Sequence, residues 1–132
     1  MTAGLAPSLV SGWLNTLRTA GAAYGPVAGT FAQLHTGDPG AAGTANASAG
    51  STARNSFTFA ASASGSALAL SSAPAAWTNG GTSETLTHIS VWTASSAGTL
   101  LFSVALNTNK PWASADTFNL TTLTVSLTPQ AA

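Results

Sequence analysis

Polar and apolar residues alternate over much of the chain after residue 30. In residues 99–106, for example, large apolar side chains occupy every second position: Leu100, Phe102, Val104 and Leu106. A period of two is typical of a strand with one buried face. Turns rich in glycine, asparagine and serine separate such segments. The pattern predicts short strands at residues 30–36, 56–63, 66–71, 75–78, 84–93, 99–106, 117–120 and 123–128, with a turn at 107–111.

A segment near the N-terminus has a different period. Four large apolar residues follow the i, i+3, i+4, i+7 spacing of one helix face: Val10, Trp13, Leu14 and Leu17. Pro7 suits the first turn and Gly21 suits the C-terminal cap, so we predict a helix over residues 7–20. A helix this short is marginal alone and must dock on something. It either covers an open end of the core or contacts a neighbouring subunit.

Together these elements predict a mainly β protein with one short N-terminal helix. Short antiparallel strands separated by tight turns are typical of a β-sandwich or a jelly-roll-like barrel. The length of 132 residues fits a single core. We expect residues 1–29 to form the helix and a connector, and residues 30–132 to form the β-sandwich domain.

Residues 37–51 are the longest stretch without a large apolar side chain and are predicted to be a loop. Asp38, Pro39 and Gly40 at its start have the composition of a tight turn. Loops this long in compact domains are usually functional or disordered, so we expect this one to contact a neighbouring molecule. Arg54 follows the loop. It either pairs with Asp38 as a clasp that closes the loop, or both remain solvated charges.

Charged side chains are scarce, which excludes several classes of partner. They make up 5% of the chain, against about 25% in an ordinary globular domain. Three basic residues cannot form the patch that a nucleic acid or an anionic membrane surface requires, so we expect neither partner. No apolar run approaches the roughly 20 residues of a membrane span. An uncharged surface instead suits a molecule packed against copies of itself, and we expect a homo-oligomer.

Few groups are available for catalysis or metal binding. The chain has no cysteine and no Gly-x-Ser-x-Gly motif, and its histidines are His35 and His88. The acids Asp38, Glu84 and Asp116 lie in three different predicted elements. We therefore expect no enzymatic activity, no catalytic residue, no metal and no cofactor. His35 ends a predicted strand, and we expect its ring to hydrogen-bond the backbone of the loop that follows.

Two segments carry a resemblance to known proteins. Residues 34–54 contain LHTGDPG and GTAN before an arginine, and residues 88–102 contain HISVW before a glycine turn and an apolar strand. Here the chain resembles small structural proteins of tailed bacteriophages that infect actinobacteria. The resemblance covers about residues 30–128. It implies a β-sandwich part of the virion without an enzymatic motif, of a group described as head-decoration, minor tail or tail-fibre-like proteins.

Within that group, one small domain without further domains or long repeats favours a capsid decoration protein. Made in the host cytoplasm, it is expected to bind the major capsid protein on the head exterior and stabilise the shell, as a homotrimer between capsomers. The alternative is a minor tail or tail-fibre-like protein of the adsorption apparatus. The residues expected to contact partners are Trp13, Leu17, Asp38, Pro39 and Arg54.

Overall fold

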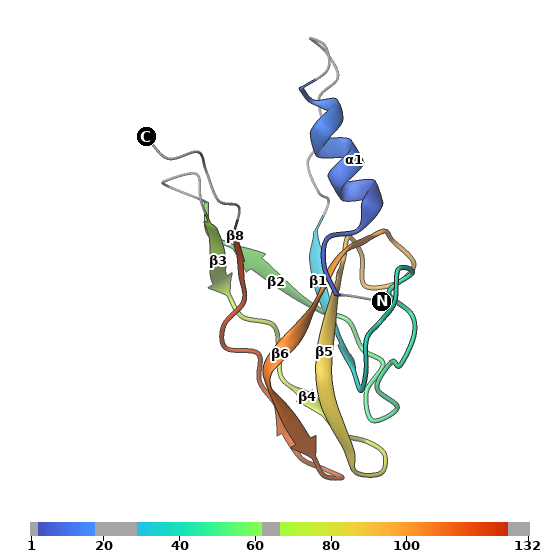
Figure 1. Ribbon diagram of the computed structural model, residues 1–132. Helices are drawn as coiled ribbons and strands as arrows, with labels where there is room; N and C mark the ends of the chain where they lie inside the picture. Colours follow the sequence, from blue (N-terminus) through green and yellow to red (C-terminus); the bar gives the residue numbers. More distant parts are fainter. Residues whose placement is uncertain (1–2, 18–28, 62–66, 127–132) are drawn as a thin grey trace.

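The body of the protein is an antiparallel sheet of six strands that curls into half of a barrel (Figure 1). The structure, a computed structural model, describes residues 3–17, 29–61 and 67–126. In spatial order the strands of the sheet are β6 (Leu100–Trp112), β5 (Glu84–Trp92), β1 (Thr30–His35), β2 (Asn55–Phe59), β3 (Ala67–Ser72) and β8 (Thr124–Ser126). A second, small sheet pairs β4 (Trp77–Thr78) with β7 (Thr117–Phe118), and α1 (Pro7–Asn15) is the helix of the described residues. The predicted fold class, mainly β and sandwich-like with one short N-terminal helix, is confirmed.

One face of the sheet, which we call the inner face, holds the main apolar core. Leu34 of β1 pairs with Ile89 of β5, and Ala32 pairs with Val91. All four side chains are at most 1% exposed. Leu120 and Leu123, from the segment before β8, are buried in the same cluster. The period-two pattern of the sequence therefore identifies this face.

The opposite face, which we call the outer face, is also buried. This differs from the prediction, because alternation of polar and apolar residues is typical of a sheet with one buried face. Ser90 and Trp92 of β5 and His35 of β1 point to the outer face, and none is more than 5% exposed. Residues 37–51 cover them: a side chain at Gly43 would meet the ring of Trp92. The predicted loop is thus a covering layer of the body.

The N-terminal segment covers the first part of edge strand β6. Ala6 donates its backbone N–H to the carbonyl of Leu101 at 2.8 Å, and Gly4 accepts from Ser103 at 2.8 Å. All four residues from Leu100 to Ser103 are buried, because α1 and the segment before it pack where solvent would otherwise lie.

Several predicted boundaries are wrong. The turn expected at 107–111 does not form, because these residues extend β6, whose Pro111 pairs with Thr85 of β5. Proline is tolerated there because β6 is an edge strand. The strand expected at 56–63 ends at Phe59. The helix ends at Asn15, and the predicted cap Gly21 lies outside the described residues.

Candidate functional site

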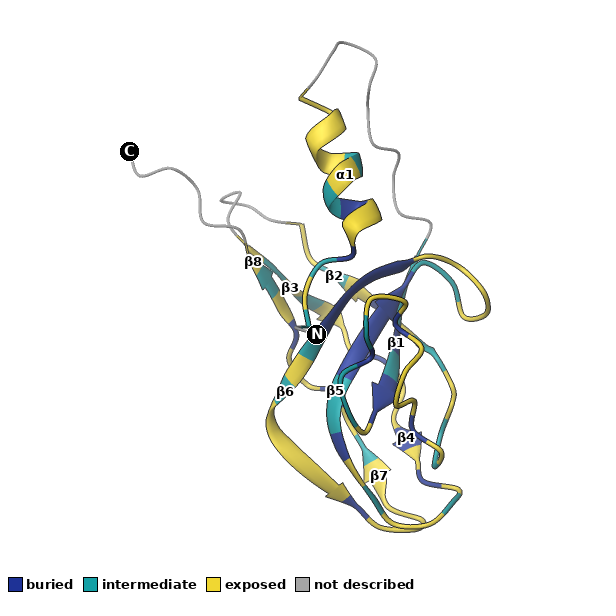
Figure 2. Ribbon diagram, turned by 45° about the vertical axis from the view of Figure 1, so that its right-hand side comes forward, coloured by how far each residue is buried: buried dark blue, intermediate teal, exposed yellow. Residues whose placement is uncertain are grey.

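α1 projects from the end of the sheet and is exposed along most of its length (Figure 2). Pro7 occupies the first turn, where its fixed backbone angle favours helix initiation. Leu9 is buried at 4% exposure, but exposure rises along the apolar stripe, from 36% at Trp13 to 61% at Leu14 and 83% at Leu17, in the turn after the helix. The stripe that the sequence predicts therefore exists. Only the start of the helix, at Leu9, packs on the core, because Trp13, Leu14 and Leu17 face solvent to an increasing degree.

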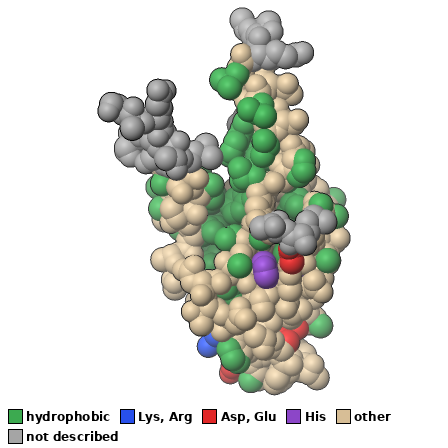
Figure 3. All heavy atoms as spheres, viewed as in Figure 1, with side chains coloured by type: hydrophobic (Ala, Val, Ile, Leu, Met, Phe, Trp, Pro, Cys, Tyr) green, Lys and Arg blue, Asp and Glu red, His purple; other side chains and the backbone are tan. Residues whose placement is uncertain are grey.

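An apolar groove lies beside α1, between the helix and strands β2, β3, β6 and β8. Its walls include Leu9 and Trp13 from the helix side, with Phe59, Leu68 and Val125 from the strands. The cavity volume is about 200 Å³. Figure 3 shows the hollow between the helix and the sheet, lined by hydrophobic side chains. We call this feature the helix groove.

The helix groove is what sequence patterns miss. Trp13 follows from helical periodicity, but Phe59, Leu68 and Val125 come from strands far apart in the chain. Phe59 pairs with Leu70 across β2 and β3, and Leu68 pairs with Val125 across β3 and β8. In the sequence, each therefore resembles an ordinary core residue of a strand. Only the curl of the sheet brings them to one wall.

The loop over the outer face is held by a buried histidine. The Nδ1–H of His35 donates to the carbonyl of Ala45 at 2.9 Å, so its Nε2 accepts from the Ser90 hydroxyl at 2.7 Å. The Ser90 oxygen in turn accepts from the Trp92 indole N–H at 2.8 Å. Burial lowers the pKa of His35 below its ordinary 6.5, and nearby His88 and Arg54 lower it further. The predicted bond from the ring to the loop backbone is confirmed.

The far end of the loop is held by a carboxylate that sequence reasoning left unassigned. Glu84, at the start of β5, accepts hydrogen bonds from the Ser48 hydroxyl and from the backbone N–H groups of Ala49 at 3.2 Å and Gly50 at 3.3 Å. Glycine and alanine carry no signal for such a contact. The loop is thus ordered by contacts with residues far along the chain.

Asp38 and Arg54 do not pair with each other, so the clasp, one of the two alternatives for these residues, does not form. Asp38 accepts from the backbone N–H of Gly40 at 2.8 Å, within its own turn. Arg54 stacks over the Trp92 ring at 3.7 Å and donates from Nε to the side-chain oxygen of Gln33 at 3.0 Å. Its guanidinium also donates to the carbonyl of Ala97, and burial lowers its pKa.

The five predicted contact residues therefore fall into two groups. Trp13 forms part of the wall of the helix groove and is partly exposed, and Leu17 is exposed in the turn after α1. Asp38 and Arg54 are tied into the loop and the sheet beneath it, and Pro39 is fully buried. Only the first group presents exposed apolar side chains.

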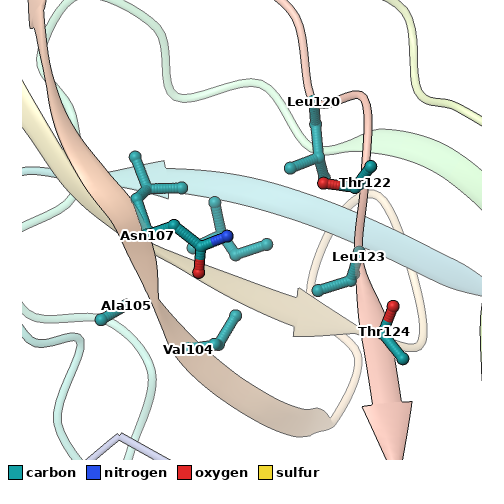
Figure 4. A pocket seen from close by; sticks show the side chains of 9 residues that line it. Val104, Ala105, Asn107, Leu120, Thr122, Leu123 and Thr124 are labelled. Carbon is teal, nitrogen blue, oxygen red and sulfur yellow. The ribbon is translucent and has the colours of Figure 1, made fainter. Parts of the chain in front are cut away.

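A second cavity, of about 220 Å³, lies between β6 and the segment that leads into β8. In Figure 4, Leu120 and Leu123 project from that segment, and Val104 and Asn107 from β6. The lining holds amide and hydroxyl groups but no charged side chain. Its chemistry allows hydrogen bonds to a neutral polar group.

Within the part of the chain that the structure describes, no three His, Cys, Asp or Glu side chains lie close enough to hold a metal ion. The same residues include no helix with the length and hydropathy to cross a membrane.

Comparison with known proteins gives one family. The family model for Podophage GP4 fiber I protein gp80 matches residues 6–128. A search of curated proteins finds no match. The matched range contains α1, both sheets and the loop over the outer face.

Proposed function

The chain belongs to the family of Podophage GP4 fiber I protein gp80, and we propose that it serves as a fibre-type structural component of the tail adsorption apparatus of a phage. The observation that carries the proposal is the extent of the match, which runs from residue 6 to residue 128 of 132. A match of this extent involves the whole fold rather than a shared local motif.

The resemblance to phage virion structural proteins is confirmed at that level by the family. The narrower expectation, an actinobacterial group with the LHTGDPG segment, stays a prediction. So does the capsid surface location. Because the family is described by a fibre protein, we favour a location on the tail over one on the head. Binding to the major capsid protein is then the alternative that the experiment below must exclude.

We further propose that the protein acts by binding and shape rather than by catalysis. The most triad-like pair, His35 and Ser90, supports this: Ser90 is fully buried, and the Nδ1 of His35 faces a backbone carbonyl instead of a carboxylate. A buried hydroxyl without access to substrate is unsuited to nucleophilic attack. The pair fits a structural clamp on the loop.

Antibody labelling of purified particles tests the location. Gold-labelled antibody fragments raised against the chain are expected to mark the tail end of virions in electron micrographs. Label spread over the head would contradict the proposal and favour capsid decoration. Absence of the chain from denatured, gradient-purified particles would contradict any role in the virion. Particles lacking the gene serve as the control.

A further inference from the structure

We propose that α1 of one copy of the chain docks in the helix groove of a second copy. Each copy presents two apolar surfaces: the exposed side chains of Leu14 and Leu17 at the end of α1, and the helix groove, whose wall includes Trp13. The inference does not depend on whether the protein lies on the tail or the head.

The charge distribution favours a second copy as occupant. The described residues carry their charges at Asp38, Arg54, Glu84, Lys110 and Asp116, and none of these lines the groove. A charged partner surface would lose its hydration there without gaining an opposite charge. The groove therefore favours a partner surface without charges, and this chain has 5% charged residues. Its most exposed large apolar side chains are those of α1 and the turn after it.

The volume of the groove argues for side chains rather than a small ligand. At about 200 Å³ it is below the roughly 300–1,000 Å³ typical of small-molecule pockets. Its lining has a single hydroxyl side chain, that of Thr30, so it offers few of the polar groups that orient a small ligand. Leucine side chains projecting from a helix require only apolar walls.

The exposed apolar area indicates that each copy must both donate its helix and accept the helix of another copy. The exposed parts of Leu14 and Leu17 amount to about 290 Å², taking about 200 Å² for a fully exposed large side chain. A stable interface needs about 800 Å² per partner, more than one helix face supplies. If every copy gives a helix and receives one, both surfaces are buried on each copy. The exchange then closes as a pair or a ring.

Mixed cysteine variants test the contact directly, because the natural chain has no cysteine. Leu14→Cys chains labelled with ¹⁵N are mixed with unlabelled Leu68→Cys chains and oxidised. A disulfide between labelled and unlabelled chains can form only between copies, and mass spectrometry distinguishes it. We expect several-fold more of it than for Leu68→Cys mixed with Thr108→Cys, a control at an exposed position of β6. Equal yields would overturn the proposal.

Glutamine variants test whether the contact holds the copies together. Leu14→Gln and Leu17→Gln are expected to weaken self-association roughly tenfold each, measured by sedimentation. Both side chains are largely exposed, so far-ultraviolet circular dichroism and the melting temperature of the single chain should stay unchanged. Ser11→Gln and Asn15→Gln, on the same helix, are the matched controls. A natural chain that sediments as a monomer, or an assembly unaffected by both leucine variants, would overturn the proposal.

Discussion

His35 joins three parts of the molecule through one ring. It extends from the end of β1, accepts from Ser90 on β5 and donates to the carbonyl of Ala45 in the loop. Each nitrogen has one partner, and the neutral ring satisfies both. A protonated ring would carry a second N–H toward Ser90, whose hydroxyl hydrogen would then lose its acceptor. The geometry thus favours the neutral form, in agreement with its lowered pKa.

Acidification is therefore expected to destabilise the protein through His35. Its folded pKa is lower than the ordinary 6.5 of the unfolded chain, so the unfolded chain takes up the proton first as the pH falls. Stability is full above pH 6.5 and is lost as the pH falls toward the folded pKa. Urea unfolding at about pH 7.5 and about pH 5.5 measures the loss. His35→Gln should reduce the pH dependence relative to the natural protein; an equal loss of stability in both proteins would contradict the account.

Arg54 stabilises the fold by shape as well as by charge. It stacks on Trp92 and donates both to Gln33 and to the turn at Ala97. A lysine keeps the charge but loses the planar fork. Arg54→Lys is expected to lower the free energy of unfolding by about 1 kcal/mol in denaturant titrations. Lys110→Arg, at an exposed position, should change it by less than about 0.5 kcal/mol; similar values for both variants would refute this role.

At the scale of elements, residues 37–51 behave as a layer that packs on β5 and β6. Gly43 lies against the sheet with a positive φ of 72°. A Cβ at this position would approach Leu100 to 2.7 Å and Trp92 to 2.8 Å, closer than side chains tolerate. The close approach of the backbone therefore depends on glycine here.

A pair of glycine variants separates close packing from backbone strain. Gly40 has a similar φ of 71°, but a Cβ there meets only Ala45 at 3.8 Å. Gly40→Ala is expected to cost about 1–2 kcal/mol from strain alone. Gly43→Ala adds overpacking and should cost about 2–4 kcal/mol in denaturant unfolding. Equal costs would mean that the loop does not press on the sheet as the structure has it.

The elements show what periodicity can and cannot predict. Strands β1 and β5 were predictable within one residue at each end, because apolar Ile89 and Val91 alternate with polar residues along β5 and the turn residues Gly37 and Asp38 follow β1. The extension of β6 past Asn107 was not, since asparagine, lysine and proline there are typical of a turn. Those residues form a strand because β5 offers backbone partners. Likewise, the loop lacks large side chains, and its order comes from His35 and Glu84, which lie outside it.

At the scale of the whole molecule, the half-barrel leaves apolar surface uncovered. Its end strands β6 and β8 are not neighbours in the sheet, and the helix groove is open on one side of α1. The sequence predicted that Trp13 and Leu17 share one face of a helix, because residues four apart in the chain lie on the same side of a helix. It could not predict the groove, which depends on the curl of the whole sheet.

Self-association through this surface should resist salt and yield to urea. The apolar contact has no ion pairs to screen, and at about 1 M salt the Debye length is only about 3 Å. Urea weakens apolar contacts by solvating them. Sedimentation is expected to show the same assembly at low salt and in ~1 M sodium chloride, and dissociation in urea concentrations below those that unfold the chain. Dissociation by salt with retention in urea would show that the few charges hold the copies together.

The number of copies in the virion tests the fibre-type account most directly. Quantitative mass spectrometry with isotope-labelled peptides, normalised to the major capsid protein of the same particles, measures it. The account predicts a small, fixed number of copies per particle, from a few to some tens, because each particle has one tail with a limited number of attachment sites. Hundreds of copies in constant ratio to the major capsid protein would contradict it, because only the head lattice offers that many sites.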